Sequence, residues 1–155
     1  MTEPWDDPRI TAFGMLVEGF ASVMSKVERD LDASCGMPVT WFEVLLRLAR
    51  SPEHRLRMAE LARQVGLSTS GLTRLVDRIE EAGFVRREAC SNDRRGANAV
   101  LTDEGEQMLH KAVPPHLESI EAHVAVPLGA DVATLERVMR SLRDANGPGE
   151  CPSAG

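Results

Sequence analysis

The spacing of apolar residues changes abruptly in the centre of the chain, and this change constrains the fold more than any other feature. Apolar residues recur at three- and four-residue steps through residues 59–65 and 69–82, as they do on one face of a helix. After Gly83 the segments 84–89 and 97–101 favour strands, and the residues between them are turn-forming. This order predicts two short helices followed by a β-hairpin.

The segments that flank these elements carry residues typical of helix ends and short strands. Ser68 is a good cap for the second of the two short helices, and Thr102 for the helix that follows the hairpin. Residues 54–58 alternate as a brief strand does. Thr40 and Glu43 fit a capping box at the start of an earlier helix, with the Glu43 carboxylate reaching back to the Thr40 amide. The segment 39–102 is therefore predicted to be a helix-turn-helix with a wing.

Long amphipathic helices are predicted on both sides of this lobe. Residues 9–34 keep a helical apolar period and residues 103–145 do so again, with Pro114-Pro115 expected to break or kink the chain. Their apolar stripes lack a sizeable partner within one small domain, which indicates that a second copy covers them. Residues 146–155 are predicted to be a disordered tail. The fold class is mainly α with a small β wing: a winged helix-turn-helix with N- and C-terminal dimerisation helices.

Charge is distributed unevenly along the chain. The formal net charge is −6, which taken alone argues against nucleic-acid binding. From residue 55 to residue 95, however, nine arginines accompany six acidic residues, so this segment carries +3 and the remainder −9. Because salt screens distant charges beyond about 8–10 Å, a basic centre can attract phosphate despite acidic ends.

Several features favour a protein of the cytoplasm that is not an enzyme. Three scattered cysteines without a CxxC pair indicate a reducing compartment. The sequence has no uninterrupted run of 18 apolar residues and no signal pattern, so neither membrane association nor export is expected. No metal-ligand spacing, phosphate loop or catalytic triad stands out, so neither a cofactor nor catalysis is expected.

The outward face of the helix at 69–82 is the main candidate for function. Hydroxyl residues and two arginines, Arg74 and Arg78, lie opposite its apolar stripe. Such a helix enters the major groove of DNA by its N-terminal end, where small residues permit close approach and Arg74 can bind guanine. Alternatively, the two arginines only pair with Asp77 and Glu81 on a solvated face.

The tip of the predicted hairpin also carries arginines. Arg94 and Arg95 suit a narrow minor groove, whose negative potential favours guanidinium groups. Asp93 is expected to hold one of them in place rather than to contact DNA. The alternative is an ordinary polar turn. Taken with the helix, the candidate DNA contacts are Ser68, Thr69, Ser70, Thr73, Arg74, Arg78, Arg86, Arg94 and Arg95.

The central sequence resembles the MarR (multiple antibiotic resistance regulator) family. Residues 67–87 are similar to the family's passage from recognition helix to wing, and residues 92–96 and 100–105 are similar to its wing and following helix start. The resemblance extends over about residues 10–144. It implies a homodimer, a pseudo-palindromic operator and a ligand-responsive repressor of transcription. It further implies that Arg95 enters the minor groove with Asp93 as its positioning partner.

The resemblance also implies a small aromatic or organic-acid effector, bound between the dimerisation helices and the DNA-binding lobe. Phe20, Trp41 and Phe42 are the candidates for lining such a pocket, and ordinary core packing is the other interpretation of these three side chains.

Two other functions stay open at this point. A protein-interaction module on the winged scaffold would present an apolar or acidic helix face. A redox-sensing regulator would use Cys35 or Cys90.

Overall fold

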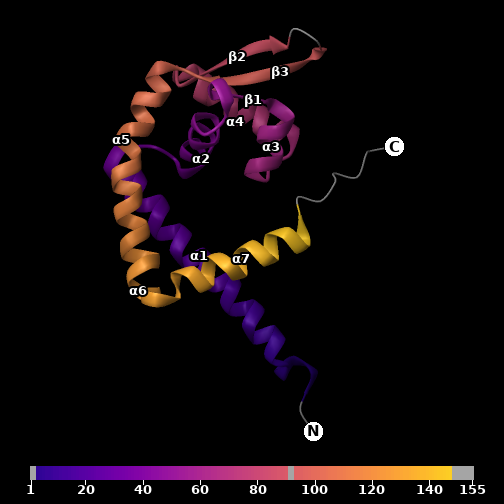
Figure 1. Cartoon of the computed structure of the whole chain (residues 1–155), viewed down its shortest axis with the longest axis vertical. Coiled ribbons are helices and arrows are strands. Elements are labelled where there is room, and N and C mark those ends of the chain that lie inside the picture. The colour runs from indigo at the N-terminus through magenta and orange to yellow at the C-terminus, as the bar shows by residue number, and fades with distance from the viewer. Residues whose placement is uncertain (1–2, 91–92, 148–155) are drawn as a thin grey trace.

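The computed structural model describes residues 3–90 and 93–147, and the side chains of residues 3–89 and 96–147. Figure 1 shows a lobe of short helices and a small sheet, joined to longer helices that extend away from it. The helices are α1 (Pro8–Cys35), α2 (Val39–Ala49), α3 (Met58–Val65), α4 (Thr69–Glu81), α5 (Asp103–Ile120), α6 (Val126–Leu128) and α7 (Val132–Asn146). The strands are β1 (Arg55–Arg57), β2 (Val85–Cys90) and β3 (Asp93–Leu101), and short 3-10 or π-helical turns occupy Pro4–Asp6, Pro52–His54, Glu121–Ala125 and Gly129–Asp131.

The lobe from α2 to β3 holds most of the hydrophobic core. Its three antiparallel strands pair in the order β1-β3-β2, and Ala99 of β3 lies opposite both Leu56 and Arg87. Fully buried leucines from the helices, such as Leu45 and Leu61, pack in the same cluster as Ala99. A mostly helical lobe with a three-stranded sheet confirms the predicted fold class.

Two predicted helix caps are confirmed. The Ser68 hydroxyl accepts a hydrogen bond from the Gly71 amide at 3.1 Å at the start of α4. The Thr102 hydroxyl accepts one from the Gly105 amide at 3.0 Å at the start of α5. Each cap satisfies an amide that has no partner inside its helix, so each fixes where the helix begins.

The predicted capping box of α2 is wrong. The helix begins at Val39 after Pro38, so Thr40 is already inside it. The ring of Pro38 holds φ at −59°, which suits the entry to a helix without a side-chain cap. The Glu43 carboxylate lies instead 3.7 Å from the guanidinium of Arg47, one turn further along the helix.

Of the predicted break or kink at the two prolines, the break is wrong, because α5 continues through Pro114 and Pro115. The proline rings cannot donate to the carbonyls four residues earlier, which belong to His110 and Lys111. Both of those residues are exposed, so water can bind the freed carbonyls at modest cost.

Two predicted boundaries move slightly. Strand β3 begins at Asp93, within the predicted turn cluster, and the β2–β3 register shifts between Ala89 and Cys90. Helix α7 extends to Asn146, one residue into the predicted tail. Gly147 follows the helix, and residues 148–155 of the predicted tail lie outside the described residues.

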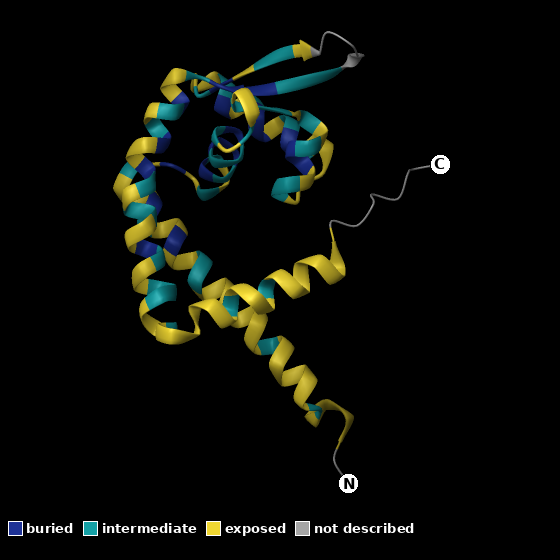
Figure 2. Ribbon diagram, viewed as in Figure 1, coloured by how far each residue is buried: buried dark blue, intermediate teal, exposed yellow. Residues whose placement is uncertain are grey.

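The terminal helices are largely exposed in the single chain (Figure 2). Only Val27 and Leu31 of α1 are buried, α7 contains no buried residue, and Phe13 and Phe20 are both 67% exposed. By length and composition α1 could span a membrane, since an 18-residue window has a mean hydropathy of 1.3 and is 6% buried. Small and polar residues interrupt the apolar ones in this window, so it contains no uninterrupted run of 18 apolar residues.

Candidate nucleic-acid interface

The first turn of α4 presents small polar groups to solvent. Ser68, Thr69 and Ser70 are all exposed. The Ser68 and Ser70 hydroxyl oxygens lie 3.3 Å apart, and the hydroxyl of Thr73 donates to the Thr69 carbonyl at 2.9 Å. A Cβ at Gly71 would lie 3.1 Å from the Ser68 oxygen, so glycine leaves room for the cap. The helix therefore offers a close, hydroxyl-lined approach at its positive end.

Arg74 and Arg78 extend this exposed face by one further turn. Arg78 Nε donates to the Arg74 carbonyl at 3.4 Å. Among the described residues neither guanidinium has a carboxylate in ion-pairing range, because Asp77 pairs with Arg87 of β2 instead. The interpretation in which the two arginines pair with Asp77 and Glu81 is therefore wrong.

Arg87 ties the wing to α4. Its Nη2 donates to the Thr73 carbonyl at 3.1 Å and also binds the Asp77 carboxylate. Its backbone amide donates to the Glu80 carboxylate at 2.8 Å, and its Nε lies 3.8 Å from the other Glu80 oxygen. One side chain from the sheet thus fixes α4 at two successive turns.

Sequence reasoning did not assign Arg87 this role. The signal lies in the alternation of the strand, since Arg87 shares a face with Val85, which is 1% exposed. A cation on the inward face of a strand next to an acidic helix requires a buried or half-buried partner.

Arg86 does not lie beside the exposed face of α4. It lies opposite Val100, as Arg55 does from the other side, so these side chains share the sheet face that points away from α4. Its Nη2 lies 2.5 Å from the Glu88 carboxylate, which also lies 3.4 Å from Arg55.

The remaining wing residues, Asp93, Arg94 and Arg95, have their backbones in β3. Their side chains lie outside the described residues, so their predicted roles stay predictions.

The three aromatic candidates for an effector pocket lie in different environments. Phe42 is buried, with its ring centroid 4.3 Å from that of His116, and Trp41 packs edge-on against Phe84 at 6.3 Å. Phe20 is exposed on α1. Burial lowers the pKa of His116, while the nearby Glu43 carboxylate acts in the opposite direction.

Comparison with known proteins places these observations in a family. A family model described as the MarR family matches residues 36–96. The chain is 28% identical over 107 residues to the transcriptional repressor MprA of Escherichia coli K12, covering 69% of this chain and 61% of MprA. It is 29% identical over 137 residues to the HTH-type transcriptional regulator PecS of Dickeya dadantii, covering 85% and 82%. The match thus spans less than two thirds of the length of MprA.

A solved structure agrees along nearly the whole chain. Sco3205, a MarR family transcriptional regulator of Streptomyces coelicolor determined in complex with DNA, is 31% identical with a TM-score of 0.87. The similarity covers 98% of this chain and 96% of Sco3205. Lobe, wing and terminal helices are therefore shared, and the chain belongs to the MarR family of transcriptional regulators.

Proposed function

We propose that the chain binds a specific double-stranded DNA sequence as a homodimer and thereby regulates transcription. The observation that carries the proposal is the outward face of α4, where Arg74 and Arg78 are exposed without carboxylate partners among the described residues. The exposed first turn adds an N-terminal dipole, which attracts phosphate. The complex of the similar Sco3205 with DNA supports the same role.

In this proposal α4 reads the major groove. Arg74 donates two hydrogen bonds to guanine O6 and N7, a contact that discriminates by about 1–3 kcal/mol. Thr69, Ser70 and Thr73 approach base edges or phosphates, and Arg78 contacts the backbone. On the wing, Arg94 and Arg95 enter the minor groove, with Asp93 holding Arg95 in place.

The homodimer is supported by the exposed apolar residues of the terminal helices. Each large apolar side chain that a second copy covers contributes about 1.5–3 kcal/mol. The apolar composition of α1 would also fit a membrane span. We assign it instead to the association of two subunits in the cytoplasm. Two-fold symmetry then predicts a pseudo-palindromic operator with half-sites about one helical turn apart. The exposed residues are Ile10, Phe13, Met15, Leu16, Val17, Phe20, Leu117, Val126, Val132, Val138 and Leu142.

Binding is proposed to repress transcription and to respond to a small aromatic or organic-acid effector. MprA, to which the chain is similar, is named a transcriptional repressor, and this supports the proposed repression. The effector would bind among Phe20, Trp41 and Phe42 and would have to favour one spacing of the two α4 helices over another.

The other candidate functions gain less support. A protein-interaction module would not need an α4 face made of hydroxyls and guanidiniums. Redox sensing by Cys35 gains no support from the described contacts, since its thiol donates to the Leu31 carbonyl at 3.2 Å inside α1. The side chain of Cys90 lies outside the described residues.

The test begins with selection of duplexes from a random library by the full chain, followed by titration with the selected operator. Arg74→Ala is expected to weaken operator binding by about 5- to 150-fold, which corresponds to about 1–3 kcal/mol, and to relax specificity at one base pair. Arg95→Ala is expected to weaken binding with loss of preference for a narrow minor groove.

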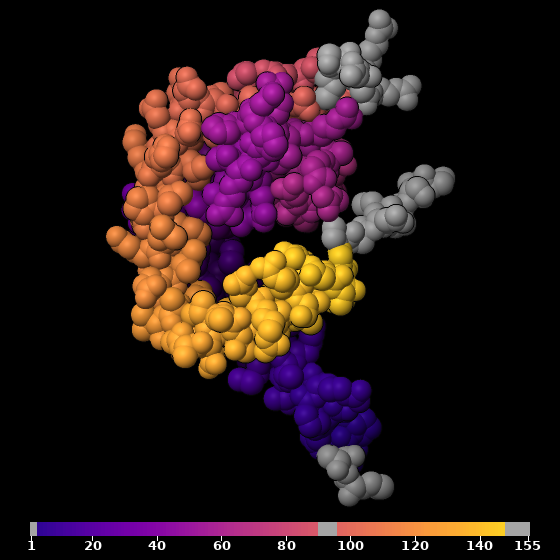
Figure 3. Space-filling model, in the orientation of Figure 1, coloured from indigo at the N-terminus to yellow at the C-terminus, as the bar shows by residue number. Residues whose placement is uncertain are grey.

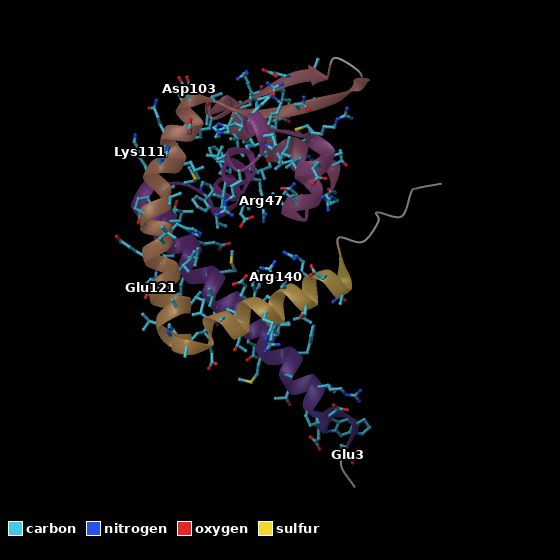
Figure 4. All side chains as sticks on the ribbon, in the orientation of Figure 1. Glu3, Arg47, Asp103, Lys111, Glu121 and Arg140 are labelled. Carbon is cyan, nitrogen blue, oxygen red and sulfur yellow. The ribbon has the colours of Figure 1, made fainter. Side chains whose placement is uncertain are left out.

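The matched control is Lys111→Ala, which removes an exposed cation of α5 on the far side of the molecule from the sheet tip (Figure 4). Unchanged operator affinity in both arginine variants, with all proteins still dimeric, would reject the assigned roles.

A further inference from the structure

A cleft lined by arginines separates the DNA-binding lobe from the C-terminal helix. The cleft has a volume of about 430 Å³ and lies between α2 and α3 on one side and the end of α7 on the other. Figure 3 shows the hollow between these two parts of the molecule. We call it the arginine cleft, and its lining residues are Arg47, Arg63, Gln64, Arg143, Asn146 and Gly147.

The arginines of the arginine cleft lie near acidic residues of their own helices, and no described ion pair crosses the cleft. Arg63 pairs with Glu60 at 2.5 Å and Arg143 with Asp144 at 2.7 Å, each on its own helix. The Arg47 guanidinium is 3.7 Å from the Glu43 carboxylate and makes no hydrogen bond among the described residues. No described hydrogen bond or ion pair crosses from α7 to α2 or α3. Three guanidiniums thus converge from three helices, and the lining itself contains no acidic side chain.

The N-terminal segment has the opposite charge. Residues 3–7 contain three acidic residues, of which Asp7 caps α1 and pairs with Arg9. The Glu3 and Asp6 carboxylates have no partner among the described residues, and Trp5 between them is 71% exposed. Aromatic rings stack favourably on guanidiniums, so all three side chains suit a surface of arginines.

This segment does not reach the cleft of its own chain. Figure 4 shows Glu3 beyond the free end of α1, whereas Arg47 faces α7 from the lobe. A helix of 28 residues is rigid and spans about 42 Å, so it holds the segment away from the body. The free half of α1 is also the part whose apolar residues need cover from a second copy.

We infer that in the homodimer residues 3–7 of each chain lie in the arginine cleft of the other chain, with Glu3 and Asp6 opposite Arg47, Arg63 and Arg143. The inference rests on the proposed dimer and adds a contact to it. By two-fold symmetry the contact occurs twice. It joins α1 of one chain to the DNA-binding lobe of the other, so it restricts the spacing of the two α4 helices.

Cross-linking tests this placement directly. In a chain with Cys35, Cys90 and Cys151 replaced by serine, one protein receives Pro4→Cys, which keeps both carboxylates, and a second, tagged protein receives Gln64→Cys. A short bis-maleimide added to the mixed dimers is expected to join the two chains in high yield. The matched control pairs Pro4→Cys with Glu81→Cys, an exposed site at the end of α4, and is expected to give no product.

The outcomes separate this inference from the proposed dimer. A dimer by light scattering that gives no cross-link between positions 4 and 64 overturns the docking and leaves the cleft to a small anion or another partner. A monomer under the same conditions overturns the dimer as well.

Charge reversal gives a second readout. Asp6→Arg and Arg143→Glu are each expected to raise the dimer dissociation constant about tenfold, because two symmetric contacts are lost together. Combining the two substitutions in one chain is expected to restore most of the affinity. Single variants that dimerise as the parent does, or a combination that is worse than either, would contradict the inference.

Discussion

The DNA-binding lobe and the terminal helices differ in where their stability comes from. In the lobe, α2, α3 and α4 bury Leu45, Leu61, Leu72 and Ile79 completely against one another and the sheet. In the terminal helices, α7 buries no residue and α1 buries only two. The lobe therefore has its own core, whereas the outer parts of α1 and α7 are exposed in the single chain and would be covered only in the proposed dimer. The comparison predicts different responses to the same kind of substitution.

The largest effect is expected from truncating the core of the lobe. Leu61→Ala should lower the free energy of unfolding by about 2–5 kcal/mol, because a fully buried leucine leaves a cavity. Phe13→Ala should instead weaken the dimer, because the ring is 67% exposed in the single chain. Urea unfolding at two protein concentrations separates the two. A Phe13→Ala variant whose loss of stability is independent of protein concentration would contradict the proposed difference between the terminal helices and the lobe.

The junction of the two regions should tolerate no added side chain. A Cβ at Gly105 would lie 2.1 Å from the Phe84 carbonyl oxygen, which accepts the Thr102 amide at 3.1 Å. Gly105→Ala is expected to cost about 1–3 kcal/mol in urea unfolding, since backbone must move. Gly83 makes a poor control because its φ of 82° is itself strained for other residues. Gly19, with open space around it, serves better, and Gly19→Ala should not destabilise the lobe.

The two neighbouring arginines of β2 should behave differently in DNA binding. Arg87→Ala should weaken operator binding by about 5- to 30-fold, about 1–2 kcal/mol, because α4 loses its tie to the wing at Thr73 and Asp77. The dependence of affinity on salt should not change, since Arg87 is not proposed to contact phosphate. If Arg86 contacts phosphate as predicted, Arg86→Ala should lower the salt slope by about 1. Equal slopes in parent and Arg86→Ala would remove Arg86 from the interface.

Local sequence signals predicted most helix and strand boundaries of the lobe, but they did not predict contacts between distant elements. The caps at Ser68 and Thr102 and the change of period after Gly83 are properties of a few adjacent residues, and they were confirmed. The capping box at Thr40 was wrong because Pro38 can start a helix by its own geometry. Local patterns of this kind do not specify how elements far apart in the sequence pack together.

The contact between α1 and the end of α5 shows what such patterns miss. Asp30 accepts a hydrogen bond from Ser119 and lies 2.9 Å from His123 Nε2, across about ninety residues of chain. Arg29 most strongly, then Ser119 and His123, lower the pKa of Asp30 to about 2. His123 lies in a π-helical turn at Glu121–Ala125, and no residue pattern in the sequence predicts that turn.

The smallest effect expected is a pH dependence of the free energy of unfolding, which arises where α5 packs against the lobe. Burial lowers the pKa of His116, and its Nδ1 is buried without a hydrogen-bond partner among the described residues. The unfolded chain therefore takes up a proton near pH 6.5 that the folded chain does not, so stability is lost as pH falls below about 6.5.

Urea midpoints at pH 7.5 and pH 5.5 measure this loss, and His116→Phe, which keeps a ring against Phe42, should reduce the difference between the two midpoints. His110→Gln is the matched control, because His110 is exposed on the same helix and should leave the difference unchanged. If His116→Phe kept the full pH dependence, the proton uptake would belong to another group, and the link between acid stability and the packing of α5 on α2 would be lost.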